Sequence, residues 1–334
     1  MVTKILKDDL GQLNIEILNN NLKRITALPS KGTYFPDSKL LTKYPIDLIK
    51  YIFDRKGCDY VIDEIRRDES PDYVYKALKF GLFSFVDEKD LENKTLLDFG
   101  CGSGASSCIL GRQINNIKII GVELDESLLE IAEMRKKYYK LQNKVSFIKS
   151  KNPESLPIQD KVDYVLLSAV YEHLLPHERK NILKMCWQIL KKNGIIFINQ
   201  TPNRWCIYEN HTTNLFIINY LPDKICHLVA KKFSKRNLEK FSWNELLRKG
   251  IRGATEKEII NNLKKLNELG EVKNLNPTKF GLNNKIDLWY KTTTTFSVKS
   301  KILKLTIRFI LKFLPFLGKI LLPGLNMAIC KKYN

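Results

Sequence analysis

A glycine-rich turn behind an acidic residue is the feature of this chain best suited to hold a ligand. An apolar stretch ends at Asp98, glycine occupies positions 100, 102 and 104, and a helical pattern follows over residues 105–114. Glycine lets the backbone turn sharply and approach a ligand where a Cβ atom would clash. A strand, a glycine turn and a helix N-terminus in this order form a cradle for a nucleotide.

The type of nucleotide follows from two details of this turn. Gly100, Gly102 and Ala105 also fit the loose pattern of dinucleotide-binding proteins, so the glycines alone do not decide. However, the third glycine comes one residue early, at Gly104, and Asp98 stands two residues before Gly100. S-adenosylmethionine (SAM) carries a cationic sulfonium and no pyrophosphate, so a carboxylate here favours SAM electrostatically.

An acidic residue at the end of the next expected strand supports the same ligand. Residues 119–123 have a strand pattern, and Glu123 closes it about 20 residues after the glycines, where an acid can contact a ribose. Its two oxygens match two adjacent ribose hydroxyls. The alternative is an exposed glutamate at a strand end.

Over about residues 94–204 the chain resembles the class I SAM-dependent methyltransferases. The motifs that carry this resemblance lie at 98–104, 121–123, 156–174 and 190–204. Glu172-His173 and residues 201–204 are most similar to the small-molecule branch, which includes quinone-precursor O-methyltransferases. The resemblance implies SAM as cofactor and a Rossmann-like, seven-stranded α/β fold. Alternating strand and helix patterns also predict a doubly wound, mostly parallel sheet.

The resemblance also assigns SAM contacts residue by residue. The matching positions are Asp98, Gly100, Cys101, Gly102, Gly104, Glu123, Leu124, Asn152, Ser168 and Glu172. Asn152 stands where the family often has an acid that reads the adenine amino group, and its amide oxygen accepts from that group without a charge. Tyr60, Arg66 or Arg67 could contact the SAM carboxylate, although a solvated charged face is the simpler interpretation.

Histidines and an acid follow the fourth and fifth expected strands, where ligands lie in open α/β sheets. Methyl transfer from SAM needs aligned reactants, and a hydroxyl acceptor also needs a base for its proton. An imidazole has a suitable pKa, so we expect His173 or His211 as the base, with Glu209 next in line. The alternative for each histidine is a hydrogen-bonded residue of a turn or loop.

The composition of the chain indicates the compartment and the molecular surroundings in which we expect the protein to act. Seven scattered cysteines show no CxxC pair and no zinc spacing, so we expect reduced thiols, a cytoplasmic protein and no metal site. The first residues include acids and no apolar run, so we expect no signal peptide. A net charge of +20 indicates polyanionic surroundings, either nucleic acid or anionic lipid.

The chain divides into five expected parts, which follow the change in pattern along the sequence. They are a helical lead-in (1–90), the SAM-binding core (91–202), an inserted helical cap over the substrate pocket (203–254), the end of the core (255–297) and a basic amphipathic tail (298–334). Within the lead-in we expect loose packing over 1–40 and helices over 44–83. Within the end of the core we expect a last strand at 285–293. The insert is expected because residues 203–254 are too long for an ordinary connection.

The tail has the pattern of a helix that lies on a membrane. Lys301, Lys304, Arg308 and Lys312 recur at helical spacing and form a basic stripe, and apolar residues fill the other faces. Such a helix suits an anionic interface, here the inner face of the membrane. The alternative is a terminal helix packed on the core. No uncharged apolar run is long enough to span a bilayer.

These observations predict a SAM-dependent methyltransferase that acts on an oxygen, less readily on carbon or nitrogen, of a small or lipid-linked acceptor. A nucleic-acid (RNA) methyltransferase is the first alternative because of the charge. Against it, the fourth strand ends in Ser168–Tyr171 and lacks the Asn/Asp-Pro-Pro-aromatic motif of amino-methylating enzymes. A non-catalytic SAM-binding or membrane-associated protein is the second alternative.

Overall fold

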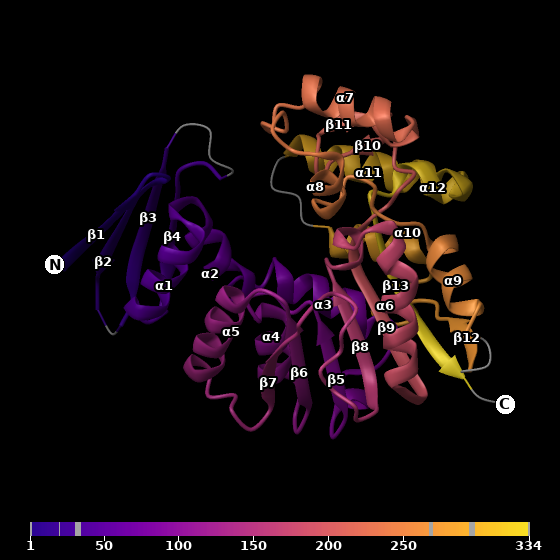
Figure 1. Cartoon of the computed structure of the whole chain (residues 1–334), viewed down its shortest axis with the longest axis horizontal. Helices are drawn as coiled ribbons and strands as arrows, with labels where there is room; N and C mark the ends of the chain where they lie inside the picture. Colours follow the sequence, from indigo (N-terminus) through magenta and orange to yellow (C-terminus); the bar gives the residue numbers. More distant parts are fainter. Residues whose placement is uncertain (1, 20, 31–34, 267–269, 294–297, 333–334) are drawn as a thin grey trace.

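A seven-stranded sheet forms the centre of the protein (Figure 1). The structure is a computed structural model that describes residues 2–19, 21–30, 35–266, 270–293 and 298–332. The strand order is β12-β13-β9-β8-β5-β6-β7. Their bounds are β5 Thr95–Phe99, β6 Lys118–Glu123, β7 Val145–Lys149, β8 Val162–Ser168, β9 Leu190–Pro202, β12 Glu271–Asn274 and β13 Gly324–Lys332.

The sheet is parallel except for one strand. β5 to β9 pair in parallel, whereas β13 pairs antiparallel with both β9 and β12. The predicted doubly wound, mostly parallel sheet is therefore confirmed. The strand order reverses between β5 and β8, which opens a ligand crevice at the carboxyl ends of these strands.

Helices cover both faces of the sheet. Their bounds are α3 Val74–Phe83, α4 Ala105–Gln113, α5 Glu126–Tyr138, α6 Pro176–Ile189, α9 Glu256–Lys264 and α10 Lys285–Thr292, with short 3-10 turns η2 at Glu88–Leu91 and η3 at Tyr171–His173. Leu96 and Leu97, neighbours on β5, belong to separate apolar clusters on opposite faces. This alternation is the period-2 geometry of a strand buried on both sides.

The N-terminal part differs from the expected loose segment. It forms an antiparallel sheet of β1 Val2–Asp8, β2 Gly11–Ile17, β3 Lys23–Pro29 and β4 Ser38–Thr42. Leu13, Ile15 and Ile25 are fully buried in one cluster with residues of the helices that follow. The expectation of a helical lead-in was wrong for this stretch because the alternation of apolar residues over 13–17 and 25–27 is a strand pattern.

The helices expected over residues 44–83 are confirmed. They are α1 Ile46–Lys56, the turn η1 Cys58–Tyr60, α2 Val61–Glu69 and α3. Figure 1 shows α2 between the N-terminal sheet and the core.

The segment 203–254 leaves the core and returns to it at the same place. The Arg204 amide donates to the Ala254 carbonyl at 2.8 Å, and the Ala254 amide donates to the Pro202 carbonyl at 2.9 Å. The segment contains β10 Tyr208–Glu209, β11 Leu215–Phe216, η4 Ile218–Tyr220, α7 Asp223–Phe233 and α8 Trp243–Arg248. It has an apolar cluster of its own, centred on Ile218, Cys226 and Leu246. We call this segment the insert.

The C-terminal part corrects two expectations. Residues 285–292 form α10, not a strand, and the Asn284 side chain caps it by accepting from the amides of Ile286 and Asp287. The last strand is β13, so residues 298–334 are not one separable tail. Before β13 come α11 Val298–Phe313, η6 Pro315–Leu317 and α12 Gly318–Leu321. The expected boundary at residue 297 lies outside the described residues.

The basic stripe predicted on α11 is divided. Lys304 and Arg308 turn toward α10, where Arg308 donates to Asp287 Oδ1 at 2.7 Å and Lys304 lies 4.7 Å from the Tyr290 ring centre. The apolar residues Ile302, Leu303, Leu305, Phe309, Ile310, Phe313 and Leu314 are exposed instead. Across the described ranges, no helix combines the length and apolar character needed to cross a membrane.

Candidate active site

A cavity of about 710 Å³ lies at the carboxyl ends of β5, β6 and β8. Of the residues predicted from the sequence, Gly100, Cys101, Gly102, Glu123, Leu124, Asn152, Ser168, His173 and His211 line it. Asp98, Gly104, Glu172 and Glu209 lie outside its lining. The structure therefore gathers most of the expected cofactor positions and both candidate histidines around one cavity.

The glycine turn has the geometry that only glycine adopts easily. Gly100, Gly102 and Gly104 have φ values of 70°, 54° and 77°, in the left-handed region. A Cβ atom on Gly104 would lie 2.7 Å from the Ala132 Cβ, and one on Gly100 would lie 2.9 Å from a Val170 methyl. A Cβ on Gly102 would meet nothing within 4 Å, so at Gly102 the turn leaves space for a ligand.

Glu123 closes the turn from the neighbouring strand. Its Oε2 accepts from the Gly102 amide at 2.9 Å, and its Oε1 accepts from the Leu124 amide at 2.7 Å. Oε1 also accepts from the Asp125 amide at 3.2 Å, so Oε2 is the oxygen that keeps a second lone pair for a ligand in the cavity. Glu123 therefore shapes the turn and leaves one acceptor position toward the cavity.

Asp98 lies beneath the turn. It is 1% exposed, and its Oδ2 accepts from the Ser107 hydroxyl at 2.7 Å. Burial raises the pKa of Asp98 to about 6, and the hydrogen bond from Ser107 opposes this shift. Asp98 lies outside the lining of the cavity, so it offers no direct contact to a ligand there.

The remaining lining fits the other parts of SAM. Asn152 is exposed, and its Oδ1 accepts from the Glu154 amide at 3.0 Å. Arg67 of α2 also lines the cavity, so the interpretation of Arg67 as a solvated residue understated its position. Burial and the nearby carboxylates raise the pKa of the Cys101 thiol well above its usual value, so Cys101 fills the turn as a neutral group. The cavity therefore offers groups that fit the donors and acceptors of SAM. They are the Glu123 carboxylate, the Asn152 amide, the open space at Gly102 and the Arg67 guanidinium.

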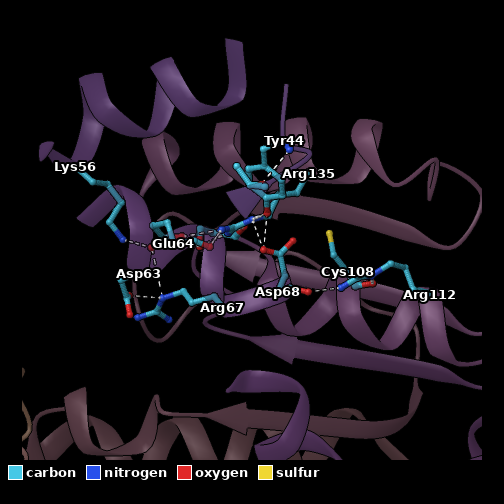
Figure 2. A network of polar contacts seen from close by, with 11 residues as sticks. Tyr44, Lys56, Asp63, Glu64, Arg67, Asp68, Cys108, Arg112 and Arg135 are labelled. Carbon is cyan, nitrogen blue, oxygen red and sulfur yellow. Dashed lines mark hydrogen bonds and ion pairs between the residues drawn. The ribbon is translucent and has the colours of Figure 1, made fainter. Parts of the chain in front are cut away.

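A buried ionic network ties this turn to the N-terminal part (Figure 2). Arg135 of α5 is fully buried and donates to the carbonyl and hydroxyl oxygens of Ser103, each at 2.6 Å. It also donates to Glu64 Oε2 at 3.0 Å and to the Tyr44 hydroxyl at 3.0 Å. Ser103 donates in turn to Glu64 at 2.7 Å. Sequence reasoning missed Arg135, which is one basic residue among several on α5.

A second group gathers where β8, η3 and the insert meet. One oxygen of Glu172 and one ring nitrogen each of His173 and His211 lie within 4.8 Å of one another. The imidazole centres are 5.7 Å apart, and His173 Nε2 is 3.8 Å from Glu172 Oε1. We call these three residues the Glu172 cluster. The sequence predicted no metal site, yet these are three groups of metal-ligating type.

Burial controls the protonation of this cluster. Burial raises the pKa of Glu172 to about 7, although the Thr201 hydroxyl donates to its Oε2 at 3.1 Å. Burial also lowers the pKa of His173, and burial with the charges of His173 and Arg236 lowers the pKa of His211 to about 4. Both imidazoles are therefore neutral near pH 7.

Hydrogen-bond donors of its own loop surround the Glu209 carboxylate. Its carboxylate accepts from the amides of His211, Thr212 and Thr213 and from the Thr213 hydroxyl, at 2.6–2.8 Å. These donors occupy the carboxylate and fix the loop that carries His211. We therefore do not propose Glu209 as a base.

Comparisons with known proteins agree with this geometry. Residues 97–198 match the family described as "Methyltransferase domain". The ubiquinone biosynthesis O-methyltransferase of Pelagibacter ubique is 34% identical over 114 residues, which cover 33% of this chain and 43% of that protein. The carboxy-S-adenosyl-L-methionine synthase of Shewanella loihica is 27% identical over 150 residues, 44% of this chain and 60% of that protein.

These similarities are partial in length. The chain spans 43% and 60% of the two curated relatives. A solved O-methyltransferase family protein from Burkholderia thailandensis aligns over 67% of this chain and 57% of its own, with 12% identity and a TM-score of 0.43, too low to support an argument. The family match covers most of the predicted motifs and the parallel part of the sheet from β5 into β9. Residues 97–198 therefore match a methyltransferase domain, and they lie in a mostly parallel, seven-stranded sheet of the type expected for class I SAM-dependent methyltransferases.

Proposed function

We propose that this protein transfers the methyl group of SAM to a hydroxyl oxygen of a small or lipid-linked acceptor in the cytoplasm. The observation that carries the proposal is the Glu172 cluster beside the SAM cavity. His173 and His211 both line that cavity, so an acceptor placed there meets two neutral imidazoles. A direct contact of this kind is what a hydroxyl needs before it can attack.

When bound, SAM supplies a methyl group already activated on a sulfonium. The acceptor oxygen forms a bond to this carbon while the carbon–sulfur bond breaks, and the sulfur keeps the electron pair. The hydroxyl proton passes to His173 or His211. The chain's main contribution is alignment, which is worth several kcal/mol of barrier.

The acceptor class rests on two supports. Two relatives are named for reactions of small molecules, an O-methyltransferase of ubiquinone biosynthesis and a carboxy-S-adenosyl-L-methionine synthase. In addition, the insert that carries His211 exposes apolar side chains, including Phe216, Leu228 and Phe233, at 59–67%. Exposed apolar side chains on the segment that carries His211 favour a lipid-linked acceptor over RNA.

We further propose that α11 places the enzyme on an anionic membrane. Its outward residues Phe309 and Phe313 are each 66% exposed, and Lys301 and Lys312 are exposed beside them. Because Lys304 and Arg308 contact α10, insertion of the apolar side chains contributes more to membrane binding than the basic residues do. We expect co-sedimentation with anionic vesicles that persists in salt and is weakened at least tenfold by Phe309→Ser with Phe313→Ser, since each buried phenylalanine contributes about 1.5–3 kcal/mol. A protein that stays in the supernatant contradicts this placement.

The function is tested with labelled SAM. The purified chain is incubated with extract fractions that are separated into lipid, small-molecule and RNA pools. We expect label in a hydroxyl-bearing molecule of the lipid or small-molecule pool. His173→Gln or His211→Gln should reduce turnover at least tenfold with SAM affinity retained, whereas His177→Gln, at an exposed position of α6, serves as the control. Label in RNA, or SAM binding without turnover in any pool, refutes the proposal.

A further inference from the structure

The Glu172 cluster contains an oxygen that no protein donor satisfies. Glu172 is 1% exposed, and its Oε1 makes no hydrogen bond to any described residue. A buried acceptor without a partner is costly, by about 1–3 kcal/mol and more for a charged group. Its neighbour at 3.8 Å is His173 Nε2.

Hydrogen bonds fix which nitrogen of each imidazole carries the proton. His173 Nδ1 lies 2.6 Å from the Arg248 carbonyl oxygen, which can only accept, so Nδ1 is protonated and Nε2 has a bare lone pair. His211 Nδ1 lies 3.2 Å from the Thr212 hydroxyl oxygen, and that hydroxyl donates to the Lys249 carbonyl at 2.8 Å. His211 Nδ1 is therefore also the donor, which leaves its Nε2 bare.

We propose that Glu172, His173 and His211 bind one divalent transition-metal cation. Three side chains that each offer a lone pair converge within 4.8 Å, and a cation satisfies all three at once. Ligands around a tetrahedral ion with bonds of about 2.0–2.1 Å are about 3.3 Å apart, so small side-chain shifts close the site. The hydrogen bonds to Arg248 and Thr212 act as the outer contacts that orient metal-bound histidines.

The backbone brings the ligands together at Gly250. A Cβ atom there would lie 2.9 Å from His211 Nδ1 and 3.2 Å from Glu172 Cγ, and Gly250 has a φ of 86°. The left-handed glycine at the end of α8 therefore lets the insert approach η3 closely. His211 and Glu172 come from distant segments that only this approach joins.

The donor set selects the cation. Two imidazoles with one carboxylate favour Zn²⁺, Co²⁺, Fe²⁺ or Mn²⁺ over Mg²⁺ and Ca²⁺, which prefer oxygen ligands. Three protein ligands leave coordination positions open, the arrangement of catalytic rather than structural sites. Both histidines line the SAM cavity, so an open position faces the acceptor.

Binding of the cation rests on the geometry alone, but its role rests on the proposed function. A hydroxyl coordinated to the cation has a lowered pKa, as metal-bound water does, and releases its proton to solvent. The histidines then act as ligands and no longer accept that proton. The oxygen keeps the electron pair that attacks the SAM methyl carbon.

The test uses the full chain after treatment with a chelator and titrates it with Co²⁺ and Zn²⁺ in the absence of SAM and acceptor. We expect one equivalent of Co²⁺ to give a visible absorption band and one equivalent of Zn²⁺ to displace it. His173→Ala and His211→Ala should each weaken binding at least tenfold, and the control His177→Ala should not. SAM affinity verifies that each variant is folded, and His211→Gln replaces any variant that is not.

Each outcome decides the proposal. No saturable binding, or binding that the two histidine variants leave unchanged, overturns it, as does a sulfur-to-cobalt charge-transfer band that places the ion on cysteine. Methyl transfer that persists in chelator without any metal binding defeats this inference and leaves the proposed function intact. Stoichiometric metal binding without methyl transfer supports the cation site and refutes the proposed function.

Discussion

Replacing Arg135 by methionine should both destabilise the fold and weaken SAM binding. Arg135 is the fully buried cation that joins Glu64 of α2 to Ser103 of the glycine turn (Figure 2). Methionine fills similar space but leaves the buried Glu64 carboxylate without this partner. Removing one member of a buried ion pair costs about 3–5 kcal/mol, a large part of the roughly 5–15 kcal/mol that stabilises a typical domain.

The effect on the cofactor follows from the same contacts. Ser103 lies between Gly102 and Gly104, and its carbonyl and hydroxyl both accept from Arg135. Without this anchor the turn samples other conformations, and SAM must pay to order it. We expect SAM affinity to fall at least tenfold under conditions in which the variant remains folded, a loss of about 1.4 kcal/mol or more.

Urea unfolding followed by tryptophan fluorescence measures the first effect, and calorimetric titration with SAM measures the second. Arg55→Met is the matched control, since Arg55 is half exposed and lies 3.7 Å from Glu130 on the surface. An exposed pair of this kind contributes at most about 1 kcal/mol. The reasoning is refuted if Arg135→Met costs no more free energy of unfolding than Arg55→Met, or if its SAM affinity equals that of the unaltered protein.

Three further substitutions test the cofactor site. Glu123→Ala should weaken SAM binding at least tenfold in calorimetry, because charge-assisted hydrogen bonds to the ribose are lost; unchanged affinity would exclude the ribose role. Gly102→Val should abolish SAM binding while the circular dichroism spectrum stays native, since its side chain enters open space in the cavity; retained binding would place SAM elsewhere. Asp98→Asn should gain stability relative to the unaltered protein as pH rises from about 4 to 6. The pKa of Asp98 is about 6 in the folded protein and about 3.9 in the unfolded chain. The stability that protonated Asp98 contributes is therefore lost over this pH range in the unaltered protein and not in the variant. Equal urea midpoints for the two proteins across that range would contradict this.

Local signals made the nucleotide part of the site predictable from sequence. The turn at Gly100–Gly104 and the acid at Glu123 lie on consecutive strands, where the strand–turn–helix pattern fixes their relative positions. The positive φ angles of the three glycines confirm what the spacing predicted. Asp98 has the predicted place at the strand end, but its burial beneath the turn depends on packing that no local pattern encodes.

The errors at the two ends have physical causes. The N-terminal strands were missed although polar residues alternate with Leu13, Ile15 and Ile25, because each alternating run is only a few residues long. Ile286, Leu288 and Tyr290 recur at every second position, as in a strand, yet the Asn284 cap starts a helix there. β13 was assigned to the tail because its position between β9 and β12 is a long-range contact.

The Glu172 cluster shows most clearly where sequence reasoning ends. His173 and His211 were both recognised, each by its place after a strand, but their 5.7 Å proximity depends on the insert folding back over η3. That return requires the left-handed Gly250 and the Glu209 carboxylate that fixes the His211 loop. Glu209 thus supports the chemistry by orienting a histidine, not by taking a proton. The same loop places the His211 imidazole near the unsatisfied Glu172 oxygen, and the proposed cation site depends on that placement.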